Sequence, residues 1–267
     1  MGQYHQFMNF DKKEILGPPA LRKLTEWSYQ SNEYLLQVEK LLKTRWKGDE
    51  VLVVGDYVDE FYEDSNQSEL LNKIKLDNQA YNIDNIYFYP YKELPNISIN
   101  GVPSRYIYNH QNKEYIDLKD QPIQWVFYDK EANCLYGAKF HPLPLLLSCS
   151  NGAGGGDYVG KSLEYVGYWC GDSKYLEISD KKLDLNYNKL DILFDEYKLG
   201  KNNNEILTNY IVDNIPLEKI QNLKFGPSLF LDEKEMEELI KNSLKKHEIK
   251  KQKEVIKNNK SYDIEDR

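Results

Sequence analysis

A glycine-rich stretch is the first place in this chain where the residue types suit ligand binding. The sequence NGAGGGD occupies residues 151–157 and is followed by tyrosine. Glycine leaves backbone N–H groups unhindered, so such a loop can form an anion-binding nest, with Asp157 orienting a sugar hydroxyl or a metal. The glycines can equally supply positive φ angles for a turn, or mobility for a contact loop. The candidate binding residues are Asn151, Gly152, Gly154, Gly155, Gly156, Asp157 and Tyr158.

The order of helix and loop argues against a phosphate site. The sequence HPLP at residues 141–144 predicts the start of a short apolar helix, and the Asn151-Gly152 pair predicts its end. In phosphate loops the glycine-rich backbone leads into a helix N-terminus, whose dipole attracts the anion. Because this loop follows a helix, a scaffold or contact loop is the favoured interpretation, and a ligand site is the alternative.

Two Trp-x-Gly-Asp turns supply carboxylates that suit acid–base or metal chemistry. One turn contains Trp46 and Asp49, and the other contains Trp169 and Asp172. A catalytic acid would need a second acid nearby. The acids available for that role are Asp56 and Asp180. The structural interpretation is favoured: tryptophan packs on the core, glycine permits the turn and aspartate caps backbone N–H groups.

Nucleophilic chemistry has weaker support. Cys149 and His141 lie in the segment that leads to the glycine loop. A thiol near a helix C-terminus has a raised pKa, so a buried structural cysteine is favoured. His5 and His110 lie on aromatic-rich strands, where a histidine is usually a satisfied core or surface group. The three cysteines have no CxxC spacing, which favours reduced thiols and predicts neither a metal nor a cofactor.

The elements that position these residues follow an internal repeat. NFDKKEIL at residues 9–16 lines up with NHQNKEYI at residues 109–116, and RWKGDEVLVV at residues 45–54 resembles YWCGDSKYLEI at residues 168–178. The two signatures occur in the same order in both halves, which indicates two related units. Each unit is expected to begin with a hairpin around a polar turn, FDKK in one and HQNK in the other.

The expected fold class is α+β: two related units of mixed or antiparallel sheet with helices, plus a C-terminal helical arm. The first unit covers residues 1–100, the second covers residues 101–230 with the glycine-rich loop, and the charged arm covers residues 231–267. Other predicted elements are an apolar helical stripe over residues 21–42, a strand at 51–54, a short helix at 70–76 and a strand at 83–91. The spacing of apolar residues in 190–197 fits a helix and a strand equally well.

The arm is basic and the rest of the chain is acidic. Asp232 and Glu235 mark a helix start, and apolar residues follow at helical spacing as far as Leu244. Residues 241–260 hold eight lysines against two glutamates, a local net charge of +6; because the whole chain carries −8, the remainder carries −14. Such an arm is either a solvated helix end or a segment that docks an acidic partner or nucleic acid.

The segments MGQY, NFDKKE, RWKGDEVLVVGDY, NHQNKEYIDL, HPLPLLLSCSNGAGGGDY and VGYWCGD together resemble an uncharacterised group of bacterial proteins. Members of that group share an MGQY start, an Asn/Lys-Glu hairpin, a GGGD loop and a Trp-x-Gly-Asp strand. The first unit departs from the pattern because it lacks the GGGD loop, and the second has LEISD where VGDY is expected. The resemblance implies the organisation of the chain but no chemistry.

Composition narrows the functional classes. The 267 residues are 40% hydrophobic and include 22 tyrosines, enough for a core and unlike a disordered chain. No apolar run of membrane length or basic-apolar leader is present, which favours a cytoplasmic protein. A net charge of −8 makes the average surface repel nucleic acid and anionic membranes.

These observations favour a non-enzymatic binding protein of the bacterial or phage cytoplasm, an immunity or anti-defence factor that occupies a toxin, an effector or a nucleotide signal. The expected partner is a protein or a small nucleotide ligand, with nucleic acid reached only through the lysine-rich arm and no membrane. The alternative is a metal-dependent hydrolase or transferase acting on a nucleotide or phosphoester, which would use Asp157, Asp172 and a metal.

Overall fold

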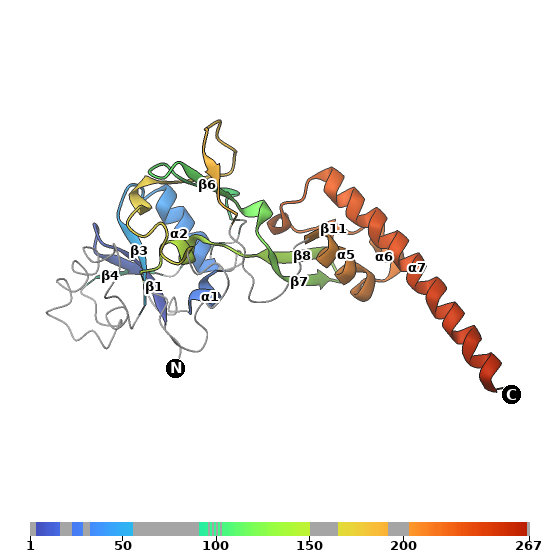
Figure 1. Cartoon of the computed structure of the whole chain (residues 1–267). Coiled ribbons are helices and arrows are strands. Elements are labelled where there is room, and N and C mark those ends of the chain that lie inside the picture. Colours follow the sequence, from blue (N-terminus) through green and yellow to red (C-terminus); the bar gives the residue numbers. More distant parts are fainter. Residues whose placement is uncertain are drawn as a thin grey trace. The chain divides into compact units, whose positions relative to one another are not determined.

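A computed structural model of the chain describes residues 4–16, 23–28, 33–55, 91–95, 97, 99, 101, 103–149, 165–191 and 203–265. The chain forms two compact units (Figure 1). The first unit comprises Met1–Gln121 and Lys139–Lys198, and the second comprises Pro122–Ala138 and Leu199–Arg267. Both combine helices with sheet, and the last element is a helix, so the predicted α+β class with a C-terminal helix is confirmed.

The first sheet of the first unit is built from the N-terminal hairpin. Its strands are β1 (His5–Asn9), β2 (Glu14–Leu16), β3 (Val51–Gly55) and β4 (Lys92–Leu94). They lie in the order β3-β1-β2-β4, with β1 antiparallel to β2 and β3, and β2 parallel to β4. The β-branched run predicted β3 correctly, and every residue of β1 and β3 is buried.

The second sheet of the first unit has the same strand order and the same directions. Its strands are β5 (Tyr106–Asn109), β6 (Glu114–Asp117), β9 (Leu176–Ser179) and β10 (Asn188–Lys189). Here β5 is antiparallel to β6 and β9, and β6 is parallel to β10. Asn109 pairs with Glu114 as Asn9 pairs with Glu14. The two predicted hairpins therefore form with one register.

Among the described residues of the first unit, three helices lie near these sheets. They are α1 (Leu24–Trp27), α2 (Glu33–Lys43) and α4 (Leu143–Leu146). The predicted apolar stripe is divided between α1 and α2, and α2 packs against β9. The helix expected to run from the HPLP sequence to Asn151 is shorter, because it ends at Leu146 and Ser148 instead forms a parallel bridge with Val53 of β3.

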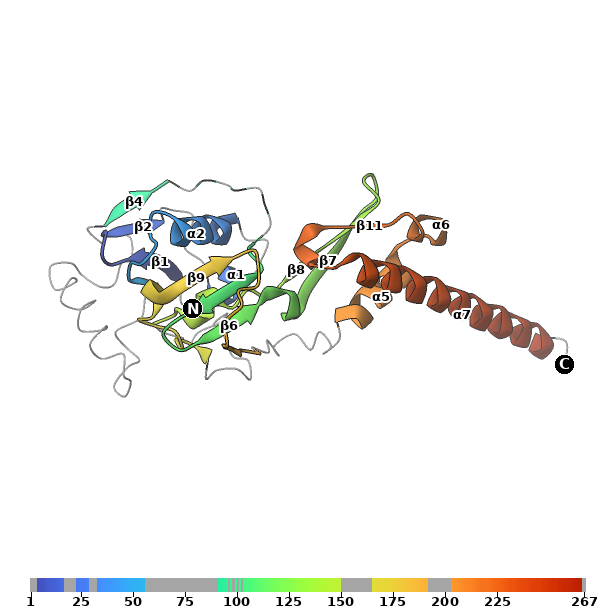
Figure 2. The ribbon, with the colours of Figure 1, turned by 90° about the horizontal axis from the view of Figure 1, so that it is seen from above.

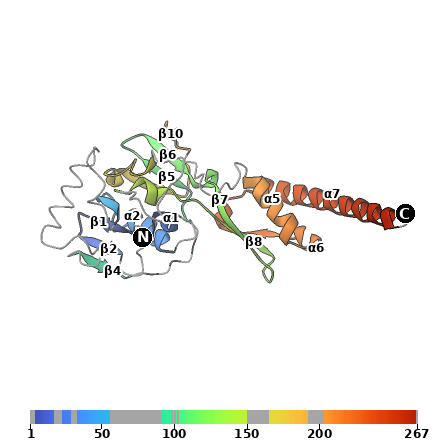
Figure 3. The same cartoon turned by 60° about the horizontal axis from the view of Figure 1, so that its bottom comes forward.

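The second unit packs helices on one face of a three-stranded sheet (Figures 2 and 3). Its elements are β7 (Ile123–Asp129), β8 (Cys134–Lys139), β11 (Lys224–Phe225), α5 (Asn203–Asn214), α6 (Leu217–Ile220) and α7 (Glu233–Glu265). Tyr128 and Leu135 of the sheet pack with Leu207 and Ile211 of α5 and Leu239 of α7 in one buried cluster. The apolar face predicted for the arm thus belongs to this core.

The turn between β7 and β8 repeats the geometry of the two predicted hairpins. Asp129 Oδ1 accepts the N–H of Ala132, Asn133 has a φ of 48°, and the Asn133 carbonyl accepts the N–H of Lys224 in β11. The equivalent bonds elsewhere are Lys12 N–H to Asn9 Oδ1, Lys92 N–H to the Lys13 carbonyl, Asn112 N–H to Asn109 Oδ1, and Asn188 N–H to the Lys113 carbonyl. The sequence repeat did not reveal this third hairpin, because it has Asp129 where the other two have asparagine and Cys134 where they have glutamate.

The compact units are not divided where the sequence repeat suggested. Both repeat segments, at residues 9–16 and 109–116, fall in the first compact unit. The predicted helix start before α7 is confirmed, because Asp232 and Glu235 exchange hydrogen bonds of 2.9 Å as a capping box. The helix predicted at residues 70–76 lies outside the described residues, and so does the strand predicted at 83–91 apart from Tyr91, which directly precedes β4. No helix in the described part of the chain combines the length and the apolar character needed to cross a bilayer.

Candidate functional site

Two matching pairs of buried groups lie at the Trp-x-Gly-Asp turns of the first unit. The indole N–H of Trp46 donates to Glu14 Oε2 at 2.9 Å, and the indole N–H of Trp169 donates to Glu114 Oε2 at 3.0 Å. Both tryptophans are fully buried and both glutamates are nearly so. A buried carboxylate needs hydrogen-bond donors to offset its desolvation. Each indole supplies one and fixes its turn against the hairpin of the same repeat.

The residue before each tryptophan supplies a second donor. Arg45 Nε donates to Glu14 at 2.8 Å, and its Nη2 also contacts that carboxylate. The hydroxyl of Tyr168 donates to Glu114 at 3.0 Å. The Arg45 guanidinium lowers the pKa of Glu14 below its ordinary value, while the bond to Glu114 raises the pKa of Tyr168. One copy is therefore an ion pair and the other a phenol–carboxylate hydrogen bond.

The two turn aspartates hold asparagine side chains. Asn9 Nδ2 donates to Asp49 Oδ2 at 2.8 Å, and Asn109 Nδ2 donates to Asp172 Oδ2 at 3.1 Å. The sequence predicted that these aspartates cap backbone N–H groups. In both hairpins it is instead the asparagine side-chain oxygen that accepts backbone N–H groups. The aspartate accepts a hydrogen bond from the amide of that asparagine. The aspartates thus stabilise the hairpin conformation. A binding role for Trp46, Asp49, Trp169 and Asp172 stays a prediction.

Ser173 joins the two turns. Its hydroxyl donates to the carbonyl of Asp49 at 3.1 Å and accepts the N–H of Val51 at 2.6 Å. The repeat segments therefore meet, as a shared carboxylate site would require. Yet Asp172 is already bound by two amide groups, those of Asn109 and Asn112. Among the described residues, no three His, Cys, Asp or Glu side chains are grouped so that they could hold a metal ion.

Of the two acids considered as partners for the turn aspartates, only Asp180 is among the described residues. Its Oδ2 lies 3.5 Å from Lys43 Nζ, and the side chain is exposed. Asp56 and residues 151–158 lie outside the described residues, so the binding role of the loop, including Asp157, stays a prediction.

The histidines considered as bases are held in hydrogen bonds or buried. His141 is fully buried: its Nε2 lies 2.8 Å from Glu39 Oε1, and its Nδ1 accepts the N–H of Leu143 at 3.4 Å. His5 is also fully buried. Neither imidazole can take a proton from a substrate in solvent. His141 instead fixes the start of α4 relative to α2.

His110 has a more exposed setting. Its Nδ1 lies 3.0 Å from the Tyr187 hydroxyl and its Nε2 lies 2.9 Å from Glu177. In the first sheet the corresponding positions are occupied by Phe10 and Tyr91, which pack edge to face at 5.9 Å inside the core. The substitution of histidine for phenylalanine makes this face of the second sheet polar. Because both ring nitrogens are engaged, the imidazole has no free lone pair with which to act as a base.

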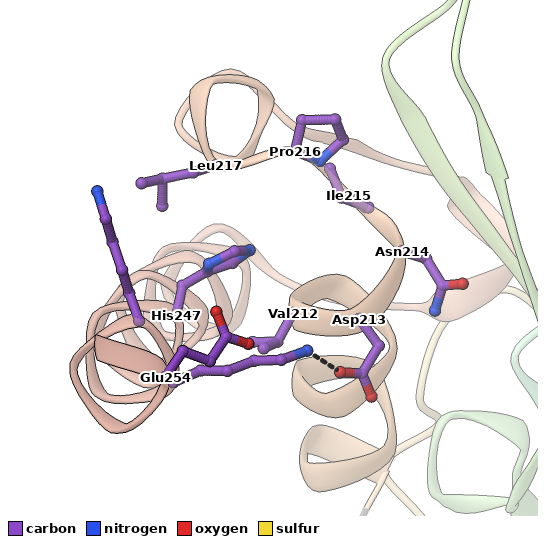
Figure 4. Close-up of a pocket in the computed structure, with 10 residues that line it drawn as sticks. Val212, Asp213, Asn214, Ile215, Pro216, Leu217, His247 and Glu254 are labelled. Carbon is purple, nitrogen blue, oxygen red and sulfur yellow. Dashed lines mark hydrogen bonds and ion pairs between the residues drawn. The ribbon is translucent and has the colours of Figure 1, made fainter. Parts of the chain in front are cut away.

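A pocket of about 640 Å³ in the second unit lies between α5, α6 and α7 (Figure 4). His247, Lys250 and Lys251 line it from α7, while Asp213 and Glu254 add negative charge. Lys250 Nζ pairs with Asp213 Oδ1 at 2.8 Å. Since the lining carries both positive and negative groups, its charge favours neither an anion nor a cation.

The outer face of the β7–β8 sheet carries three exposed aromatic side chains. Trp125 is 41% exposed, Phe127 is 56% exposed and Tyr136 is 36% exposed. Val126 and Tyr128, which alternate with them on β7, contact the helices on the inner face. We call Trp125, Phe127 and Tyr136 the aromatic face. Sequence reasoning missed it, although the alternation in IQWVFYD places two large aromatics on the face opposite the core residues.

The aromatic face is the most distinctive surface among the described residues. Large exposed apolar groups that are contiguous on one face mark interaction sites more often than single exposed residues do. Known proteins offer no independent guide, since no protein family, curated protein or solved structure matches the chain.

Proposed function

We propose that the protein is a non-enzymatic binding protein whose partner is another protein, recognised through the aromatic face. The observation that carries this proposal is the exposure of Trp125, Phe127 and Tyr136 on one side of a sheet whose other side packs against α5, α6 and α7. Protein interfaces are enriched in these three residue types, and binding energy concentrates on such anchors.

The Tyr136 ring of the aromatic face and the strand below it are closely packed. Tyr136 lies against Gly226 so closely that a Cβ at residue 226 would come within 2.6 Å of the Tyr136 ring. The side chain of Leu229 fills the space under Gly137 on the inner face. A ring held in this way loses little conformational entropy on binding, which favours affinity.

The class of partner follows from composition and charge. The net charge of −8 lies mainly in the first unit, so it favours long-range attraction of a basic protein, while the aromatic face would contact an apolar patch on that protein. A toxin or effector that acts on nucleic acid has such a surface. The proposal therefore extends to an immunity or anti-defence factor that occupies a protein of this kind.

The experiment places a photo-crosslinking residue at Trp125 in the full chain, identifies the crosslinked protein by mass spectrometry, and then measures the affinity between the two purified proteins. The double variant Trp125→Ser/Phe127→Ser should weaken that affinity by about 100-fold or more, as expected for loss of two hot-spot residues. The matched control is Ile97→Ser/Leu185→Ser, which removes two exposed apolar residues of the first unit. This control should bind like the unchanged protein.

Circular dichroism and the unfolding midpoint show whether each variant is folded. A folded Trp125→Ser/Phe127→Ser protein that retains full affinity would place the binding site elsewhere, and the proposal would be wrong.

A further inference from the structure

Two cysteines of the first unit lie side by side. Cys149 Sγ is 3.3 Å from Cys170 Sγ, although the residues are 21 positions apart in the chain. Cys149 is held on β3, where its N–H donates to the Val53 carbonyl at 2.8 Å. Cys170 belongs to the second Trp-x-Gly-Asp turn, directly after Trp169. The third cysteine, Cys134, belongs to the second unit. The structure agrees with the prediction of reduced thiols and of a buried Cys149, since both cysteines are free and Cys149 is buried. The closeness of Cys149 to Cys170 was not predicted.

The two thiols differ in access. Cys149 is fully buried in a cluster with Met8, Phe10 and Leu52, whereas Cys170 is partly exposed. The hydrogen bond with Cys170, together with burial, raises the pKa of the Cys149 thiol well above its usual range. Cys149 thus stays protonated at neutral pH, and Cys170 is the sulfur that an oxidant in solvent can reach.

We propose that Cys149 and Cys170 form an oxidation site that a hydroperoxide converts to an intramolecular disulfide. The Cys170 sulfur attacks the peroxide, the O–O bond breaks, and Cys170 becomes a sulfenic acid while one water or alcohol leaves. The Cys149 sulfur then attacks Cys170 and gives up its proton in this step; the S–O bond breaks, the leaving hydroxyl takes that proton and departs as one water, and the S–S bond forms. Two electrons pass from the thiols to the peroxide.

The local structure allows the sulfurs to close the remaining gap. A disulfide needs the sulfurs about 2.05 Å apart, so the pair must approach by a little more than about 1 Å. Both backbones are anchored to β3 or α4: Cys149 bonds to Val53, and the N–H of Trp169 donates to the Leu146 carbonyl at 2.9 Å. The disulfide would join β3 to the turn that carries Asp172.

The test uses the purified full chain, reduced and then treated with excess hydrogen peroxide. The expected product has lost about 2 Da, the mass of two thiol hydrogens. After trypsin digestion, peptide 140–161 should be found joined to peptide 162–174 by the disulfide, while Cys134 still reacts with iodoacetamide. The unfolding midpoint should rise by roughly 5 °C and return on reduction with dithiothreitol, because the crosslink constrains the unfolded chain.

Single variants separate the roles of the cysteines. Cys134→Ser should form the same linked peptides. Cys149→Ala should give a sulfenic acid at Cys170 that dimedone traps, with no linked peptides, and Cys170→Ser should leave Cys149 unoxidised. The proposal is overturned if the treated natural sequence gives links only between chains or through Cys134, or if Cys149 and Cys170 remain alkylatable. These readouts on the natural sequence hold whether or not a variant folds.

Discussion

The indole N–H of Trp169 lies 3.0 Å from the carboxylate of Glu114, 55 residues earlier in the chain, and both groups are buried. The same relationship joins Trp46 to Glu14. Because the asparagine, aspartate and backbone bonds around these pairs also correspond, the two segments form one kind of structure twice. Their origin by duplication stays a prediction, and the shared geometry lets variants in one copy be controlled by variants in the other.

Neutralising the two buried glutamates should have unequal effects. In Glu14→Gln the new amide N–H₂ faces the Arg45 guanidinium, which has no acceptor, so unfolding free energy should fall by about 2–3 kcal/mol. In Glu114→Gln it faces the Tyr168 hydroxyl, which can accept, so the loss should be about 1 kcal/mol. Urea unfolding measures both. Glu131→Gln, at an exposed turn, is the control and should change stability by less than about 0.5 kcal/mol. Equal losses at Glu14 and Glu114 would contradict the assigned donors.

Acid should weaken the first hairpin through Glu14. The hydrogen bond to Arg45 lowers the pKa of Glu14 from its ordinary value of 4.5, and the Trp46 indole adds to this. A carboxyl whose pKa is lower in the folded state stabilises the fold above its unfolded pKa, and this contribution is lost as pH falls through the folded pKa. Unfolding free energy, measured by urea from about pH 7 to about pH 3, should therefore fall less steeply in Glu14→Gln than in the natural sequence. Parallel curves would show that Glu14 is not the responsible group.

In each Trp-x-Gly-Asp turn, glycine should be required only because the backbone φ angle at that position is positive. Gly48 has a φ of +80° and Gly171 a φ of +89°, and an added Cβ at either residue would meet no atom within 4 Å. Gly48→Ala and Gly171→Ala should each cost about 1 kcal/mol from backbone strain. Gly101, with equal space and no positive φ, is the matched control, and Gly101→Ala should be neutral or slightly stabilising. A cost at Gly101 equal to that at Gly171 would remove the conformational explanation.

Removing the end of α7 should leave the second unit folded. Truncation after Leu244 removes the exposed contacts of Lys246 with Asn209 and of Lys250 with Asp213, which contribute little to stability. The unfolding midpoint should therefore fall by less than about 5 °C. Leu239→Ala is the contrasting variant, because Leu239 is buried against the sheet and its loss should lower the midpoint further.

A larger loss on truncation would mean that the end of α7 is part of the core. The same truncated protein tests the nucleic-acid alternative. If the arm binds nucleic acid, affinity for a mixed-sequence duplex should fall steeply with salt in the full chain and vanish in the truncated one.

The sequence by itself determined the local structures of this chain. The Asn-x-x-x-Lys-Glu hairpins, the β-branched strand β3 and the capping box before α7 depend on residues within a few positions of one another, and turn, strand and cap chemistry act at that range. The third hairpin obeys the same local rule but was missed, because Asp129 replaces the asparagine on which the repeat was recognised.

Only the tertiary structure decided which groups meet. Trp169 and Glu114, Cys149 and Cys170, and His110 and Tyr187 are brought together by the folding of segments 21 to 77 residues apart in the chain. Neither spacing nor composition encodes such contacts, because they follow from the register and order of strands. The exposure of the aromatic face also depends on which side of its sheet α5 and α7 cover. That side is set by where Val126, Tyr128 and Leu135 bury their apolar surface, which is a property of the whole unit.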